Sequence, residues 1–302
     1  MGHDHAHGAG VEHRGRLALV LGLTLAVLVL QVVVGTLTGS LALLADAGHL
    51  LSDSLGLVLA LAAIAVAQRP GGPRSTYGRH RTEVLAAGAN ALVLLGICVV
   101  IAVNAVRRLE DPPSIEGGWA LVAGAIGLAV NVLGLVILRA GAKESLNVRG
   151  AYLEVLGDAL GSVAVIGSAL LILTLGWDAA DPVASLVIAA LVLPRAVSLL
   201  RDVAEVLLET SPRDVDLDQV RDHILGVPGV VDVHDLHVWT ITSGMPVMSA
   251  HVVVDDTVVA MADAHDVLDH LVTCLSQHFD VAHSTFQLEP TGHLDSERHG
   301  HR

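Results

Sequence analysis

The sequence predicts an all-α bundle of six transmembrane helices, followed by a small cytoplasmic α+β domain. The 302 residues are 53% hydrophobic and only 16% charged, which is too apolar for a single soluble domain. Several stretches of about 20 residues, the length that crosses the apolar core of a bilayer, carry no charged residue. From about Glu209 onward, charged and apolar residues are interleaved as they are in soluble domains.

The composition also excludes several classes of function. Aromatic residues make up 2%, the formal charge is −14, and the two cysteines, Cys98 and Cys274, lie far apart. These values argue against an aromatic ligand cage, a nucleic-acid binder and a disulfide framework. By contrast, the 17 histidines equal lysine and arginine together. Because imidazole is the commonest transition-metal ligand, the composition indicates a membrane protein that handles metal.

Residues 16–208 are predicted to form the transmembrane domain. The first uncharged stretch, residues 17–45, is too long for one helix, and glycine and threonine interrupt it near residues 35–40. It therefore predicts a helix, a turn and a second helix. Asp181 before Pro182 is typical of a helix start. The six spans are expected at residues 16–38, 41–67, 82–107, 115–138, 148–175 and 181–199.

Basic residues in the loops predict that both termini lie in the cytoplasm. The loops after the second and fourth spans are rich in arginine and lysine, whereas the loops after the first and fifth spans have none. Only Arg107 and Arg108 fall on the opposite side. Since cytoplasmic loops carry the excess of basic residues, we expect a multi-pass protein of the cell membrane, surrounded by lipid.

Residues 209–290 are predicted to form a two-layer domain in the order αββαβ. Two segments repeat apolar residues at helical spacing, and three are rich in β-branched or alternating apolar residues. Ser243 and Gly244 separate the first two strands, as in a hairpin. The helices are expected at residues 217–225 and 262–279, and the strands at residues 230–242, 246–255 and 283–288.

Two pairs of ionisable residues are expected near the middle of the bilayer. His49 and Asp53 lie four residues apart in the second span, and Glu154 and Asp158 lie four apart in the fifth. In a helix, this spacing puts each pair on one face. An unpaired charge near the bilayer centre costs about 2.5 to 3.5 kcal/mol, so these groups need compensation. If the two spans touch, one imidazole and three carboxylates converge as a tetrahedral dication requires.

Each of these residues has a simpler explanation when it is taken alone. A single intramembrane carboxyl group serves helix packing or a proton relay when it is protonated and hydrogen-bonded to a neighbouring span. The same spacing at matched depth in two spans favours a metal site, because packing gives no reason for the repetition. Asp46, one turn before His49, stays open. It is either a partner that orients His49, or a gate or packing residue.

Four runs of sequence resemble the cation diffusion facilitator family. They are SLALLADAGHLLSD at residues 40–53, YGRHRTE at 77–83, NVRGAYLEVLGD at 147–158 and VHDLHVW at 233–239. The similarity covers about residues 13–290 and is greatest to the bacterial cobalt-zinc-cadmium resistance branch. It implies a homodimeric metal/proton antiporter with a ferredoxin-like, metallochaperone-like cytoplasmic domain. The residues that match the family's transport site are His49, Asp53, Glu154 and Asp158.

Glu154 departs from the pattern of many zinc-transporting relatives, which carry histidine at this position. One imidazole with three carboxylates makes a harder and more anionic site, so exclusive zinc selectivity is not expected. We expect Zn²⁺ as the exported ion, with Co²⁺ and Cd²⁺ tolerated. Because these donors bind metal only when they are deprotonated, metal and protons compete for the site. That competition suits an antiporter that needs no tightly bound cofactor.

The resemblance also implies a metal site in the cytoplasmic domain. Zn²⁺ bound there would be a structural or regulatory ion that tightens the dimer. His265 would bridge a second ion, as in some relatives, and Asp235 and His237 are reserve ligands. The residues that match the site are His234, His251, His283 and Glu289.

Other histidines lie outside these sites. Residues 1–15 and 291–302 are expected to be flexible, histidine-containing tails that either capture metal weakly or are merely solvated. The loop after the second span offers only His80 among several arginines, so the further site that some relatives hold there is not expected.

Two alternative functions stay open. One is a membrane metal sensor without transport, although no kinase, nucleotide-binding or DNA-reading element follows the spans. The other is a Mn²⁺ or Fe²⁺ exporter of the same fold. A metallohydrolase is not expected, because the sequence lacks an HExxH motif. We therefore expect a transporter rather than an enzyme, with divalent metal ions and protons as its partners.

Overall fold

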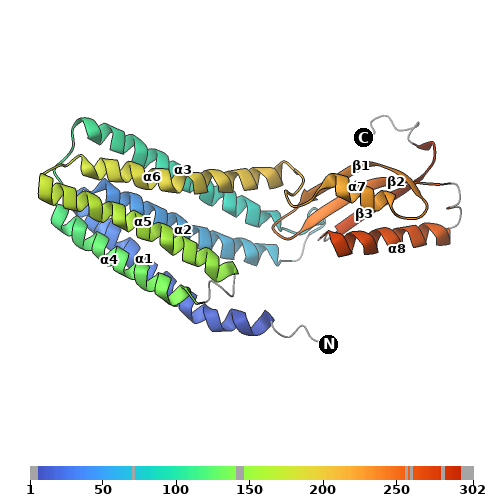
Figure 1. Cartoon of the computed structure of the whole chain (residues 1–302), viewed down its shortest axis with the longest axis horizontal. Coiled ribbons are helices and arrows are strands. Elements are labelled where there is room, and N and C mark those ends of the chain that lie inside the picture. Colours follow the sequence, from blue (N-terminus) through green and yellow to red (C-terminus); the bar gives the residue numbers. More distant parts are fainter. Residues whose placement is uncertain are drawn as a thin grey trace. The chain divides into compact units, whose positions relative to one another are not determined.

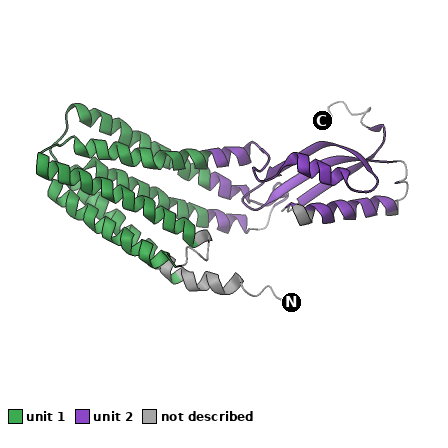
Figure 2. Ribbon diagram, viewed as in Figure 1, with its two compact units in different colours: residues 1–61, 87–200 green, residues 62–86, 201–302 purple. Residues whose placement is uncertain are grey.

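The computed structural model describes residues 6–69, 72–140, 146–255, 258, 261–279 and 283–293. It contains six long helices, then a short helix, two strands, a helix and a last strand (Figure 1). These elements divide into two compact units (Figure 2). The first comprises residues 1–61 and 87–200, and the second comprises residues 62–86 and 201–302.

All six long helices contain a stretch long and apolar enough to cross a membrane. The predicted bundle of six membrane-spanning helices is thereby confirmed. The sixth helix continues to Leu207, beyond the expected end at residue 199, because charged residues end the apolar part of a helix without ending the helix itself. The first helix begins inside the segment expected to be the N-terminal tail. The bounds are α1 Ala6–Thr38, α2 Leu41–Ala67, α3 Arg81–Glu110, α4 Gly117–Leu138, α5 Leu146–Leu175 and α6 Ala180–Leu207.

Small residues let α4 approach α5 closely in the first unit. A Cβ atom at Gly124 would lie 3.0 Å from Val165, and one at Gly134 would lie 3.2 Å from Val155. Gly and other small residues are typical of close contacts between membrane helices. The close packing fixes α5, which carries two of the expected metal ligands.

The turn between α1 and α2 is held by hydrogen bonds from two other helices. The carboxylate of Asp181 in α6 accepts the Ser40 hydroxyl at 2.6 Å and the Leu41 N–H at 2.7 Å. Arg108 of α3 donates to the Gly39 carbonyl at 2.6 Å. Asp181 therefore caps the start of α2, in addition to marking the start of its own helix. An acidic acceptor at this position is favourable, because the first N–H groups of a helix lack internal partners.

The second unit contains the predicted αββαβ domain. Strand β2 pairs with β1 in the antiparallel sense and with β3 in the parallel sense. The parallel pairing requires a crossover, which α8 supplies. Apolar side chains of α7, α8 and the sheet form its core, including Ile224, Met248 and Leu271. The bounds are α7 Leu217–Leu225, β1 Val230–Thr240, β2 Pro246–Val254, α8 Met261–His278 and β3 His283–Pro290.

The start of α3 also belongs to the second unit. Arg81 lies 2.6 Å from Glu209, and the Thr242 hydroxyl donates to Glu83 at 3.0 Å. Both residues of α3 come from the YGRHRTE run. These contacts give Arg81 and Glu83 a structural role.

Candidate metal sites

Three of the four intramembrane residues converge between α2 and α5. His49 Nε2 lies 3.7 Å from Asp53 Oδ2 and 3.5 Å from Asp158 Oδ1. One ligand atom from each residue lies within 4.8 Å of the others. The helical spacing of four residues accounts for the first of these contacts, and the approach of α5 to α2 accounts for the second. We call His49, Asp53 and Asp158 the intramembrane triad.

Two atoms of the triad lack hydrogen bonds. His49 and Asp158 are buried, and neither His49 Nδ1 nor Asp158 Oδ1 has a hydrogen-bond partner among the described residues. Buried polar atoms are seldom left unpaired, because they lose their hydration without replacement. A divalent cation beside the carboxylates would supply the missing interaction for the Asp158 oxygen.

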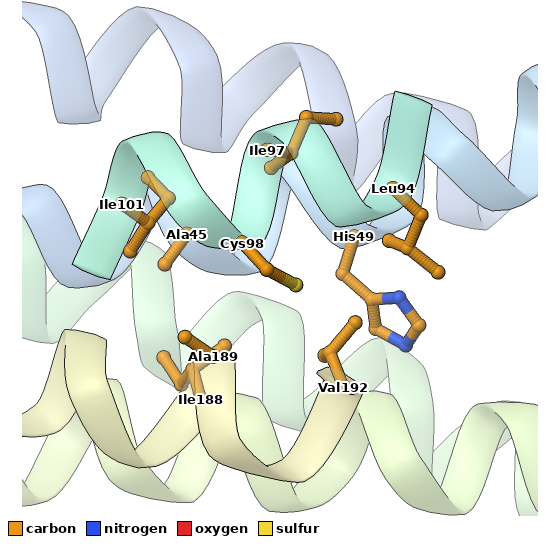
Figure 3. Close-up of a pocket in the computed structure, with 9 residues that line it drawn as sticks. All are labelled: Ala45, His49, Leu94, Ile97, Cys98, Ile101, Ile188, Ala189 and Val192. Carbon is orange, nitrogen blue, oxygen red and sulfur yellow. The ribbon is translucent and has the colours of Figure 1, made fainter. Parts of the chain in front are cut away.

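On its other side, His49 borders an apolar cavity between α2, α3 and α6 (Figure 3). The cavity has a volume of about 10 Å³, which is room for about one water molecule. No carboxylate lines it. The imidazole therefore lies at the boundary between apolar packing and the carboxylates. The other lining residues are Ala45, Leu94, Ile97, Cys98, Ile101, Ile188, Ala189 and Val192.

Glu154, the fourth expected ligand, is bound to an arginine instead. Its Oε1 atom accepts a hydrogen bond from Arg195 Nη2 at 2.6 Å, while Arg195 Nη1 lies 3.3 Å from Asp53 Oδ2. The Glu154 side chain is 49% exposed, whereas that of Asp158 is 5% exposed. Glu154 therefore lies at the edge of the triad rather than within it.

The sequence interpretation missed Arg195. The residue directly follows the uncharged stretch 182–194, and it escaped notice although it lies within the predicted sixth span. A useful signal was present, because a charged residue inside a predicted span is by default a functional candidate.

Asp46 is hydrogen-bonded to helices other than its own. Its Oδ2 atom accepts from Gln31 Nε2 at 2.6 Å and lies 3.5 Å from the Ser162 hydroxyl, which in turn accepts from Asn131 at 3.3 Å. This network joins α1, α2, α4 and α5. The contacts favour the packing role for Asp46 over a role as partner of His49.

A second group of potential ligands crosses all three strands of the sheet. Glu289 Oε2 lies 3.1 Å from His234 Nε2, and Glu289 Oε1 lies 2.8 Å from His251 Nδ1. The strand register explains the group, because His234 pairs with His251 and Glu289 pairs with Val253, two residues further along β2. Side chains two residues apart share a face of a strand. We call His234, His251 and Glu289 the sheet triad.

The other expected cytoplasmic ligands lie outside the sheet triad. His283 begins β3 opposite Val247, is exposed, and contacts the Tyr77 ring. Glu289 lies six positions further along the strand, about 20 Å away. His265 is 71% exposed and lies 3.5 Å from Asp269 on its own helix. Asp235 and His237 are also outside the triad.

Gln287 is the neighbour of Glu289 that the sequence interpretation did not consider. Its side-chain nitrogen donates to Glu289 Oε1 at 2.7 Å. The sequence could have indicated Gln287, because a residue two positions before a predicted strand ligand lies on the same face of the strand.

Two family descriptions match the chain. The cation efflux transmembrane domain matches residues 17–208, and the cytoplasmic domain of cation efflux proteins matches residues 212–291. The chain belongs to the cation diffusion facilitator family. This membership confirms the resemblance and makes this cation diffusion facilitator a multi-pass membrane protein.

Several curated proteins are similar to this cation diffusion facilitator over nearly its full length. The metal cation efflux system protein CzcD of Cupriavidus metallidurans is 43% identical, over 99% of this chain and 93% of that protein. The cadmium, cobalt and zinc/H(+)-K(+) antiporter of Bacillus subtilis is 38% identical, over 97% of this chain and 93% of that protein. The zinc transporter ZitB of Escherichia coli is also 38% identical, over 100% of this chain and 98% of that protein.

Among the solved structures that match part of the chain is the metal-bound C-terminal domain of the CzcD transporter from Cupriavidus metallidurans. It is 43% identical, the match covers 25% of this chain and 99% of that chain, and the TM-score is 0.23.

Proposed function

We propose that this chain is a proton-coupled antiporter that exports Zn²⁺ from the cytoplasm, with Co²⁺ and Cd²⁺ as further substrates. The observation that carries the proposal is the intramembrane triad, in which an imidazole and two carboxylates from two spans converge with unpaired buried atoms. One of the similar proteins is a cadmium, cobalt and zinc/H(+)-K(+) antiporter and another is a zinc transporter, which supports this choice of ions.

Proton coupling follows from the chemistry of the donors. Imidazole and carboxylate groups bind a dication only when they have lost their protons, so metal entry expels protons and proton entry expels metal. Moving a dication outward against about 100 mV costs about 4.6 kcal/mol, twice the cost of one charge. Each proton that returns through the emptied site recovers about half of that amount.

The exposure of the site supports entry from the end at which α2 ends and α5 begins. His49 and Asp158 are buried, Asp53 is 18% exposed and Glu154 is 49% exposed. The apolar cavity lies on the other side of His49. With both termini in the cytoplasm, as we propose, the exposed end of the site is the cytoplasmic end. Release on the other side then requires a rearrangement of the helices, as in other transporters.

We also propose that the sheet triad holds a regulatory Zn²⁺ and that the protein is a homodimer in the cell membrane. Two imidazoles and one carboxylate are a suitable donor set for Zn²⁺. The donors come from β1, β2 and β3, so a bound ion would cross-link the sheet. Glu289 is 2% exposed and would gain a cationic partner.

Metal uptake into inside-out vesicles tests the antiporter. Zn²⁺, Co²⁺, Cd²⁺ and Mn²⁺ are offered separately while lumenal pH is recorded. Wild-type vesicles should take up Zn²⁺ and release protons, whereas Asp158→Asn should abolish both because one triad carboxylate is lost.

Asp111→Asn is the matched control, because Asp111 lies in the exposed connection between α3 and α4. It should transport like the wild type. If the wild type binds metal but moves no ion, the sensor alternative replaces the antiporter. A flux of Mn²⁺ far above that of Zn²⁺ would contradict the choice of ion.

A further inference from the structure

Arg195 of α6 links the expected metal ligands of α2 to those of α5. From α6, it reaches Glu154 of α5 with Nη2 at 2.6 Å and Asp53 of α2 with Nη1 at 3.3 Å. Two different nitrogens of the guanidinium serve the two carboxylates, which fits its planar, forked shape. Both partners are residues expected to bind the transported ion.

The guanidinium changes the charge that the site offers to a metal. Asp53, Glu154 and Asp158 carry a formal charge of −3 when they are ionised, and Arg195 stays positively charged in proteins. Three negative charges and one positive charge leave −2, which a single dication neutralises. Without Arg195, the same carboxylates would hold a dication with one negative charge in excess.

Arg195 also competes with metal for Glu154. The Glu154 oxygen that accepts from Arg195 cannot give its full electron density to a metal at the same time. The Arg195 side chain is 42% exposed and Glu154 is 49% exposed, so the pair has room to separate. A dication that arrives from this more exposed side therefore finds Glu154 already hydrogen-bonded to Arg195.

The backbone beside Arg195 is a weak point of α6. Pro194 lies inside the helix. Proline has no N–H group, so the carbonyl of Ala190 loses its helical hydrogen bond, and bends concentrate at such positions. A bend at Pro194 would shift Arg195 relative to α2 and α5.

We infer that Arg195 is a tethered counter-cation that occupies the metal-free transport site. It holds Glu154 and Asp53 when no metal is present, releases Glu154 when a dication binds the intramembrane triad, and returns as the metal leaves. The inference rests on the proposed transport site. Its consequence is that Arg195 weakens equilibrium binding of the metal and thereby speeds its release.

The test measures Zn²⁺ binding and Zn²⁺ flux with the same full-length protein in lipid. Binding that Asp158→Asn removes is assigned to the transport site, and binding that remains is assigned to the cytoplasmic domain. Arg195→Gln should lower the transport-site Kd at least tenfold and slow flux at saturating Zn²⁺ at least tenfold. Arg195→Lys keeps the charge but loses the forked shape, so both effects should be clearly smaller than those of Arg195→Gln.

A double variant separates the charge balance from a structural role. Glu154→Gln with Arg195→Gln removes one charge of each sign, so the formal charge of the site returns to −2. Its Kd should therefore rise from the lowered value of Arg195→Gln to the wild-type value or above it, because Glu154 is also an expected ligand. If Arg195 had only a structural role, Arg195→Gln would bind Zn²⁺ more weakly than the wild type, and the double variant would bind it at least as weakly.

Three results would overturn the inference. The first is unchanged or weaker Zn²⁺ binding by Arg195→Gln. The second is a loss of Zn²⁺ flux in Arg195→Lys as large as that in Arg195→Gln. The third is a double variant whose Kd does not rise above that of Arg195→Gln. Retained cytoplasmic binding shows that the cytoplasmic domain of a variant is folded, and thermal unfolding in detergent at the wild-type temperature shows that its membrane-spanning unit is folded. If the wild type shows no binding or flux that depends on Asp158, the proposed function itself fails and the role of Arg195 fails with it.

Discussion

Gly161 is the residue that brings Asp46 against α5. A Cβ atom built at Gly161 would collide with the Asp46 carboxylate, whereas a Cβ atom at Gly157, one turn earlier, meets nothing within 4 Å. The network of Asp46 with Gln31 and Ser162 thus depends on the absence of one side chain. At this scale, a single added methyl group would displace the Asp46 carboxylate from its hydrogen bonds.

Gly161→Ala should therefore destabilise the protein, by about 1–3 kcal/mol for an overpacked position. Gly157→Ala should be neutral or stabilising, because alanine is the better helix former. Thermal unfolding in detergent compares the two. An equal melting temperature for both variants would show that the space between α2 and α5 at Gly161 can accept an added methyl group.

His251 and His283 give a second comparison of single residues. His251→Ala should abolish the Zn²⁺ binding that remains in an Asp158→Asn background, since it removes one sheet-triad ligand 2.8 Å from Glu289. His283→Ala should leave this binding unchanged, because His283 lies at the far end of β3. Isothermal titration measures both. Comparable losses in the two variants would place His283 among the ligands after all.

Among the elements, α6 has two separate tasks. At its start, Asp181 binds the beginning of α2, and near its middle Arg195 binds Asp53 further along the same helix. The helix that carries His49 is therefore attached to α6 at two levels. Only the Arg195 contact involves an expected metal ligand. The Asp181 contact can therefore stay unchanged while the Arg195 contact rearranges on metal binding.

Asp181→Ala should cost about 1–3 kcal/mol, because the Ser40 hydroxyl and the Leu41 N–H would lose a buried acceptor. Asp178→Ala, in the adjacent connection, serves as the control and should have little effect. Melting temperatures with and without Zn²⁺ measure the loss. If Asp181→Ala melts like the wild type, the turn between α1 and α2 does not need this cap.

For the molecule as a whole, transport should respond to pH on each side with opposite sign. Low pH on the side where metal binds protonates imidazole and carboxylates and weakens binding, and low pH on the release side favours export. The apparent Kd for Zn²⁺ at the transport site should rise at least about tenfold between pH 7.5 and pH 5.5. A Kd independent of pH would contradict proton coupling at this site.

Most of the fold could be predicted from the sequence, because its signals are local. Uncharged stretches gave the six spans, and the αββαβ order followed from apolar periodicity and the hairpin residues Ser243 and Gly244. The end of α6 could not be predicted in this way, because a helix continues in water after its apolar stretch ends.

The candidate sites were less predictable because they depend on contacts between elements. The spacing of His49 and Asp53 indicated a shared helix face, but nothing in the sequence showed that Glu154 would meet Arg195 instead of the triad. In the same way, His283 and Glu289 lie on one strand, and only the register shows which of them faces His251.

The tight turn at Gly39 and Ser40 affects where proteases can cleave the protein. At the same ends of the helices, the other two connections are residues 111–116 and 176–179. None of these three segments contains lysine or arginine, and the nearest arginines, Arg107 and Arg108, lie inside α3. With both termini in the cytoplasm, as proposed, trypsin added to intact cells should leave the chain uncut, whereas in inside-out vesicles it should cleave after Arg74 or Arg139.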